Sequence, residues 1–97
     1  MLDLDVKYIK FIKDIIHRIL PEAHIFIYGS RVQGVAREYS DVDIALKCAE
    51  KVKFTDLLKI KSIFQNSTFP YKVDLVDLND LKPEFLKIIE KDLFELK

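Results

Sequence analysis

Apolar residues recur at intervals of three and four in two long stretches of the chain. Residues 5–20 follow this pattern, which predicts an amphipathic helix that the next residue, a proline, ends. Residues 54–64 predict a second helix of the same kind. A third is expected near the C-terminus, where Asn79 or Asp80 would be the N-cap and Pro83 would lie in the first turn. Its apolar side would carry Phe85, Leu86, Ile89 and Leu93.

Three shorter stretches are rich in β-branched and aromatic residues and predict strands. They cover His24–Tyr28, residues 41–47 and residues 71–78. The connection between the first two strands holds both glycines of the chain, Gly29 and Gly34, which predicts a tight loop and a short helix. Helices and strands alternate along the whole chain. This order predicts an α/β (α+β) fold with a small mixed sheet of about three strands flanked by helices.

Composition narrows the classes of protein that the chain can represent. Hydrophobic residues make up 49% of its 97 residues, enough for the core of one small domain over residues 1–97. Its 16 Lys and Arg residues only balance 16 Asp and Glu residues, so direct binding to DNA is not expected. No apolar run approaches the roughly 20 residues of a membrane span. The single cysteine, Cys48, and an acidic N-terminus without a signal-peptide apolar block predict a cytoplasmic protein.

The first predicted strand ends in a corner that suits a polyphosphate. Gly29 has no Cβ to block the approach of a phosphate to the backbone, and Ser30 adds a hydroxyl donor. The short helix that follows presents N–H groups at its N-terminus. Arg31 and Arg37 are candidates for charge-assisted hydrogen bonds to the same anion.

Carboxylates gather on the next two strands. Asp41 and Asp43 lie two residues apart on one strand, so they point to one face with their Cα atoms roughly 6.5 Å apart, and two such groups can chelate a hard cation. If the third strand pairs beside the second, Asp74 joins them. Asp77, three residues later, would point to the opposite face. Three acids beside a phosphate-binding corner predict metal-assisted phosphoryl or nucleotidyl transfer.

The order and spacing of these residues resemble a known family. The stretch GSRVQGVAREYSDVDIALK, with the later acid in VDLVD, resembles the G-S-x(9–10)-D-x-D signature of the DNA-polymerase-beta-like nucleotidyltransferases. The short length and flanking helices resemble the minimal nucleotidyltransferases. That class is often encoded beside a helical HEPN partner, as an antitoxin or an AMP-transferring module. The resemblance covers the chain from the first predicted strand through the last helix.

The resemblance implies a role for each matching residue. Asp41 and Asp43 would bind two Mg²⁺ ions, and Asp74 would complete one metal site and help activate the attacking hydroxyl group. Relatives often carry a basic residue where this chain has Gln33. The nucleotide-binding set would comprise Gly29, Ser30, Arg31 and Ser40.

Two functions follow from this interpretation. The first is a Mg-dependent nucleotidyltransferase that moves AMP from ATP to a hydroxyl group of a partner protein, as the antitoxin of a HEPN pair. The alternative is a catalytically weak nucleotide-binding module that neutralises a helical partner by contact. An aspartyl-phosphate phosphatase is disfavoured, because its D-x-D motif belongs on the first strand. The C-terminal segment has more apolar residues than one helix face can bury, so we expect a second chain there, a HEPN-type protein or another copy of this one.

Overall fold

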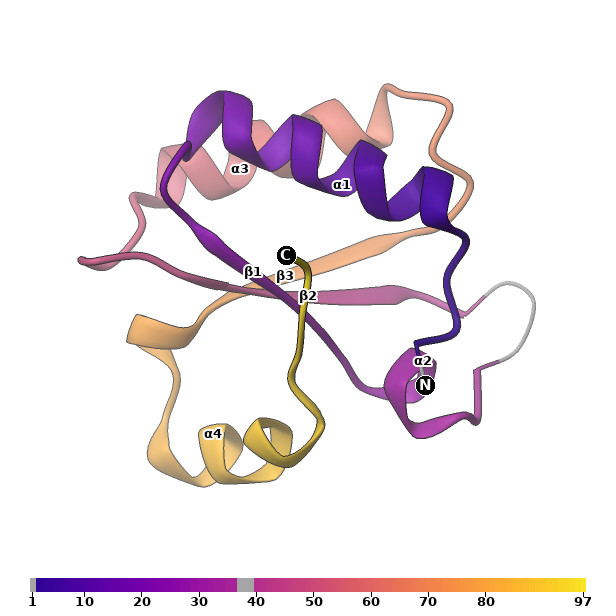
Figure 1. The fold of residues 1–97 in the computed structure, drawn as a ribbon. Coiled ribbons are helices and arrows are strands. Elements are labelled where there is room, and N and C mark those ends of the chain that lie inside the picture. The colour runs from indigo at the N-terminus through magenta and orange to yellow at the C-terminus, as the bar shows by residue number, and fades with distance from the viewer. Residues whose placement is uncertain (1, 37–39) are drawn as a thin grey trace.

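Four strands form one mixed sheet in the computed structural model, which describes residues 2–36 and 40–97 (Figure 1). The sheet has the strand order β3-β2-β1-β4. β1 runs antiparallel to both of its neighbours, whereas β2 and β3 are parallel. The strands are β1 (His24–Tyr28), β2 (Val42–Lys47), β3 (Val73–Asp77) and β4 (Phe94–Glu95). The predicted α/β class is confirmed, with one strand more than expected.

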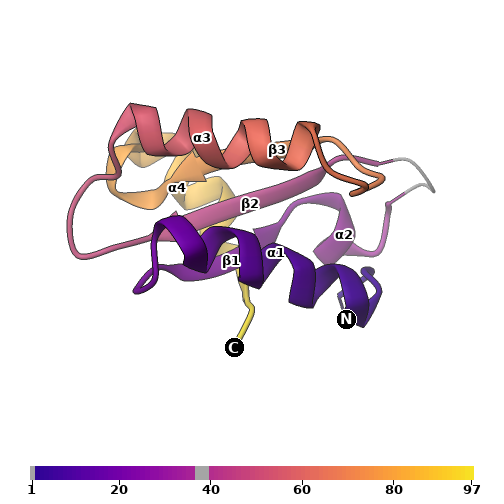
Figure 2. The same ribbon diagram turned by 90° about the horizontal axis from the view of Figure 1, so that it is seen from above.

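Helices cover both faces of the sheet. α1 (Val6–Ile19) and α3 (Phe54–Gln65) lie side by side on one face (Figures 1 and 2). The shorter α4 (Pro83–Ile89) lies on the other face, and α2 (Ser30–Gln33) follows the end of β1 (Figure 1). α3 also makes the crossover that a parallel pair of strands requires, because it connects β2 to β3. Within the described residues, no helix is both long and apolar enough to cross a membrane.

The main core lies between the sheet and the pair α1 and α3. Side chains alternate along β2, so Val42, Ile44 and Leu46 all point into this core, where they are fully buried. A smaller cluster lies under α4, where Tyr28, Ala45 and Ile89 are buried together. α4 covers only part of this face of the sheet, since Asp74 on the same face is exposed to solvent. The main core also includes Ile12, Ile15, Ile16, Ile25, Ile27, Ile60, Phe64 and Val73.

The C-terminal segment differs from the prediction. Neither Asn79 nor Asp80 caps α4, because both belong to a 3₁₀ turn, η1 (Leu78–Asp80), and α4 begins at Pro83 itself. Proline suits the first helical position, because its fixed φ matches the helix and its missing N–H is not needed there. The helix ends at Ile89, so Leu93 follows it. The chain then passes through a second 3₁₀ turn, η2 (Glu90–Asp92), and continues into β4.

The second and third strands are shorter than predicted. β2 begins at Val42, so Asp41 lies just before the strand. β3 covers Val73–Asp77 rather than residues 71–78. Tyr71 instead packs edge-on against the rings of Tyr8 and Phe69. The paired residues of β2 and β3 begin two positions later, at Val73.

Asp77 ends β3 as a buried acceptor of backbone hydrogen bonds. Only 4% of its surface is exposed. Its Oδ2 accepts from the N–H of Val52 at 2.7 Å, and its Oδ1 accepts from the N–H of Asn79 at 3.0 Å. As predicted, it is separate from the face that carries Asp74. The bonds show a structural role, since they fix the segments that follow β2 and β3.

We expect Asp77→Ala to lower the free energy of unfolding by about 2–3 kcal/mol, because it leaves two backbone N–H groups without their charged acceptor. Asp77→Asn keeps one acceptor oxygen and should lose less. The control is Asp14→Ala, which removes an exposed acid 3.9 Å from Lys10 and should change stability by less than about 1 kcal/mol. Urea denaturation measures all three. Equal stability of Asp77→Ala and wild type would contradict the structural role.

Candidate functional site

Three polar side chains form a row across the face of the sheet that α4 partly covers. Tyr28 on β1 pairs with Asp43 on β2, and Asp43 pairs with Asp74 on β3. Directly paired residues point to the same face, and neighbouring strands lie about 4.8 Å apart. Tyr28 is buried, Asp43 is half-buried and Asp74 is exposed. The structure therefore brings Asp43 and Asp74 together, as the predicted pairing of their strands requires.

Asp41 lies at the edge of this row. It is exposed and precedes β2 by one residue. Burial raises the pKa of Asp43 most, the charge of Asp74 adds to the shift, and the charge of Asp41 contributes least. As placed, no three acidic, histidine or cysteine side chains of the described residues are gathered closely enough to hold a metal ion. Asp41, Asp43 and Asp74 still supply the carboxylate oxygens that Mg²⁺ prefers, on neighbouring segments.

The row carries an electrostatic penalty at neutral pH. Burial raises the pKa of Asp43 to about 6, and the charges of Asp74 and Asp41 add to the shift. Burial also raises the pKa of Tyr28 to about 12, again with contributions from Asp74 and Asp43. The phenol therefore stays protonated, while the carboxylates repel each other. A bound cation would relieve this repulsion.

Gly29 touches the central carboxylate of the row. Its φ of 78° and ψ of −146° lie in a region that only glycine adopts readily. A Cβ at this position would come within 2.5 Å of Asp43 Oδ2. The missing side chain thus makes room for the Asp43 carboxylate. The sequence predicts that this glycine admits a phosphate, and that role stays a prediction.

The remaining residues of the predicted binding set lie around this corner. Ser30 is the first residue of α2, next to Gly29. Ser40 precedes Asp41, and its carbonyl accepts a hydrogen bond from Arg31. Arg37 lies outside the described residues.

Arg31 does not have the surroundings of a phosphate ligand. Only 4% of its surface is exposed, and its Nη atoms donate to the carbonyls of Asp3 and Ser40. Its guanidinium carbon lies 4.1 Å from the centroid of the Tyr71 ring. Its Nε has no hydrogen-bond partner among the described residues. These contacts hold the guanidinium inside the protein, and the predicted role of Arg31 in nucleotide binding stays a prediction.

Tyr28 belongs to the small buried cluster under α4 and also lies beside the carboxylates, a place that the sequence motif does not indicate. The sequence carried a signal for it. Side chains alternate along β1, so Tyr28 points away from the face of Ile25 and Ile27. It also directly precedes Gly29, at the end of the strand where the site was predicted.

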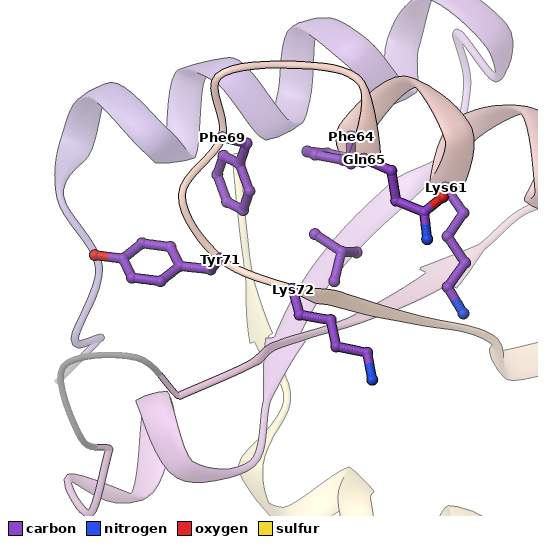
Figure 3. Close-up of a pocket in the computed structure, with 7 residues that line it drawn as sticks. Lys61, Phe64, Gln65, Phe69, Tyr71 and Lys72 are labelled. Atoms are coloured by element: carbon purple, nitrogen blue, oxygen red, sulfur yellow. The ribbon is translucent and has the colours of Figure 1, made fainter.

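A cavity of about 240 Å³ lies apart from the row, beside the C-terminal end of α3 (Figure 3). Figure 3 shows the rings of Phe64 and Phe69 among the side chains that line it. Both rings belong to the main core, on the face of the sheet opposite Asp74. The cavity is therefore separate from the carboxylate row. Its lining residues are Lys61, Phe64, Gln65, Phe69, Tyr71, Lys72 and Val73.

Comparison with known proteins agrees with the family that the sequence motif resembles. Residues 10–94 match the family described as Polymerase beta, Nucleotidyltransferase. Over 90 residues the chain is 33% identical to the probable protein adenylyltransferase MntA of Haemophilus influenzae. That alignment covers 93% of this chain and 79% of the relative.

Two solved structures are similar in fold. A toxin–antitoxin crystal structure with AMP-PNP has a TM-score of 0.69 and 23% identity. The match covers 88% of this chain and 72% of the chain in that structure. A tri-AMPylated Shewanella oneidensis HEPN toxin in complex with MNT antitoxin has a TM-score of 0.63 and 21% identity. The match covers 92% of this chain and 71% of the other. At these identities the likeness supports the fold.

The two glycines allow a matched test of the Gly29–Asp43 contact. We expect Gly29→Ala to destabilise the protein more than Gly34→Ala. Both residues have positive φ, but a Cβ at Gly34 meets nothing within 4 Å. Gly34→Ala should cost about 1 kcal/mol from backbone strain, and Gly29→Ala about 1–3 kcal/mol more from the clash and its more restricted backbone. Adding Asp43→Ala should recover part of the loss at Gly29. Equal losses in the two single variants, measured by urea denaturation, would contradict the contact.

The raised pKa of Asp43 predicts a pH-dependent stability. Between pH 4 and 6 the folded protein holds a proton on Asp43 that the unfolded chain has lost. The stability from this group is therefore complete at the acid end and lost as the pH rises through about 6. Relative to wild type, Asp43→Asn should gain stability across this window, whereas Asp14→Asn should not. Parallel urea-denaturation curves at pH 4, 5, 6 and 7 measure the difference, and no relative gain would refute the shifted titration.

Proposed function

Because the chain belongs to the polymerase beta nucleotidyltransferase family, we propose that it transfers AMP from ATP to a hydroxyl group of a HEPN-type partner protein. The observation that carries this proposal is the pairing of Asp43 with Asp74 beside the Gly29–Ser30 corner. The MntA relative is named a probable protein adenylyltransferase, and the similar structures include one with AMP-PNP and one with an AMPylated HEPN toxin.

The unpaired Cys48 suits a reducing cytoplasmic setting.

The corner would hold the nucleotide and the row would carry the chemistry. The backbone N–H groups and the hydroxyl of Ser30 would donate to the phosphates. Asp41, Asp43 and Asp74 would hold two Mg²⁺ ions, which when bound supply positive charge to the phosphates. Asp43 lies in the middle, against Gly29, so it fixes the distance between the corner and the carboxylates.

Asp74, like Asp41, is a carboxylate that an acceptor can reach. It is exposed and lies on β3, the outer strand of the sheet. In the proposed reaction the acceptor oxygen forms a bond to the α-phosphorus of ATP. The bond from that phosphorus to the bridging oxygen breaks, and pyrophosphate leaves. Asp74 would take the proton of the acceptor hydroxyl.

A second function, neutralisation of the partner by contact, is favoured by the surface of α4. Phe85 is 40% exposed and Ile88 is 67% exposed, three residues apart on one side of the helix. Phe94, which follows α4, is also exposed, at 41%, whereas Ile89 and Leu96 are buried. An apolar helix face of this kind can pack against a helical partner without any transfer of AMP.

Transfer can be tested with ATP labelled at the α-phosphate, Mg²⁺ and a HEPN-type partner. We expect label on the partner and release of pyrophosphate. Asp43→Asn and Asp74→Asn should each lower the rate by about 100-fold or more, because they remove charge next to the reacting phosphate. Asp14→Asn, an exposed acid on α1, is the control and should keep the rate. Unchanged labelling by an Asp41→Asn, Asp43→Asn double variant would eliminate the catalytic proposal. Protection from the partner's toxicity by that variant, without labelling, would establish neutralisation by contact.

A further inference from the structure

One buried side chain joins three separate segments near the carboxylate row. Arg31 Nη2 donates to the carbonyl of Ser40 at 2.8 Å, and Nη1 donates to the carbonyl of Asp3 at 3.0 Å. The Arg31 carbonyl accepts from the N–H of Asp3 at 2.8 Å, so the N-terminal segment is held twice. The guanidinium also lies over the ring of Tyr71, 4.1 Å from its centroid. Figure 3 shows that ring extending from the segment before β3 toward the segment before α1.

These contacts coincide with the beginnings of the two carboxylate-bearing strands. Ser40 directly precedes Asp41, and Tyr71 lies three residues before Asp74. The beginnings of β2 and β3 are also joined to each other, because the N–H of Val42 donates to the carbonyl of Lys72 at 2.9 Å. Arg31 itself follows Ser30 in the chain. One residue therefore reaches the nucleotide corner through its backbone and the start of both strands through its side chain.

We propose that Arg31 is a positioning residue that sets the carboxylates of β2 and β3 relative to the Gly29–Ser30 corner, and that it does not bind the nucleotide. This inference rests on the proposed function. The bonded carbonyls and the ring fix the guanidinium inside the protein, so its charge cannot swing out to a phosphate without breaking them. The side chain acts on the reaction through Ser40 and Tyr71.

The geometry calls for arginine in particular. A guanidinium is planar and offers donors in fixed directions, so it can bind two carbonyls and stack on a ring at once. A lysine ammonium keeps the charge but lacks the flat face and the fork. Arg31→Lys should therefore fail to restore the alignment, although it conserves charge.

The test compares Arg31→Ala and Arg31→Lys with Arg18→Ala, which removes an exposed arginine of α1. Transfer of AMP is assayed well below each melting temperature. We expect both Arg31 variants to lower kcat by roughly 10- to 100-fold, because small misplacements of reacting groups are costly. The KM for ATP should change by less than about threefold, since no nucleotide contact is lost. Millimolar guanidinium, but not ammonium, should raise kcat of Arg31→Ala.

Two results would overturn the inference. A rise in the KM for ATP with unchanged kcat would identify Arg31 as a nucleotide ligand. A lower melting temperature with unchanged kcat and KM would identify it as a residue of stability alone.

Amide hydrogen exchange tests the same contacts without any reaction. In Arg31→Ala the N–H groups of Asp3 and Val42 should exchange faster, while that of Ile44 in the centre of β2 keeps its protection. Faster exchange at all three N–H groups, or exchange rates equal to those of wild type, would contradict the positioning role. If wild type transfers no AMP, the proposed function fails, and the exchange result still decides whether Arg31 holds the beginnings of β2 and β3.

Discussion

The structure depends on the position of β2 between two differently oriented neighbours. Val42, Ile44 and Leu46 are fully buried against α1 and α3, so the residues between them must face the other side of the sheet. A shift of one residue would move all three out of the core, which makes any other register very unfavourable. The pairing that buries these side chains also sets Asp43 between Tyr28 and Asp74. The hydrophobic core on one face thus dictates the arrangement of polar groups on the other.

Two buried charged residues hold the ends of the parallel pair formed by β2 and β3. Where the strands begin, Arg31 binds the carbonyl before Asp41 and lies over Tyr71. Where they end, Asp77 accepts from the N–H groups of Val52 and Asn79, which follow β2 and β3. Each of these contacts restricts where a strand begins or ends. A buried charge with backbone partners is well suited to this, because its hydrogen bonds are directional and their loss is costly.

The carboxylate row opposes stability, and the architecture tolerates it because the main core lies on the other face. Burial and the charges of Asp74 and Asp41 raise the pKa of Asp43, which shows that the ionised row is strained at neutral pH. Such perturbed groups are typical of functional sites. Gly29 sharpens the arrangement, since any larger residue there would displace the central carboxylate. In the proposed reaction the same crowding would favour the binding of cations.

The sequence by itself determined that the helices, the first three strands and the Gly29–Ser30 corner exist, and it determined the family, since these depend on periodicity and on motifs within a few residues. It did not determine where the last helix and the second and third strands begin and end. It also placed Asp43 and Asp74 on one face, provided that their strands pair. Only the tertiary structure decided the rest. β4 has two residues, too few for a periodic signal, and exists because β1 offers a free edge. The surroundings of Arg31 were not predictable either: an arginine after a glycine–serine corner suggests an anion. Two of its three side-chain partners, Asp3 and Tyr71, lie 28 and 40 residues away. Contacts at such separations are set by how the sheet and helices pack, which local sequence does not encode.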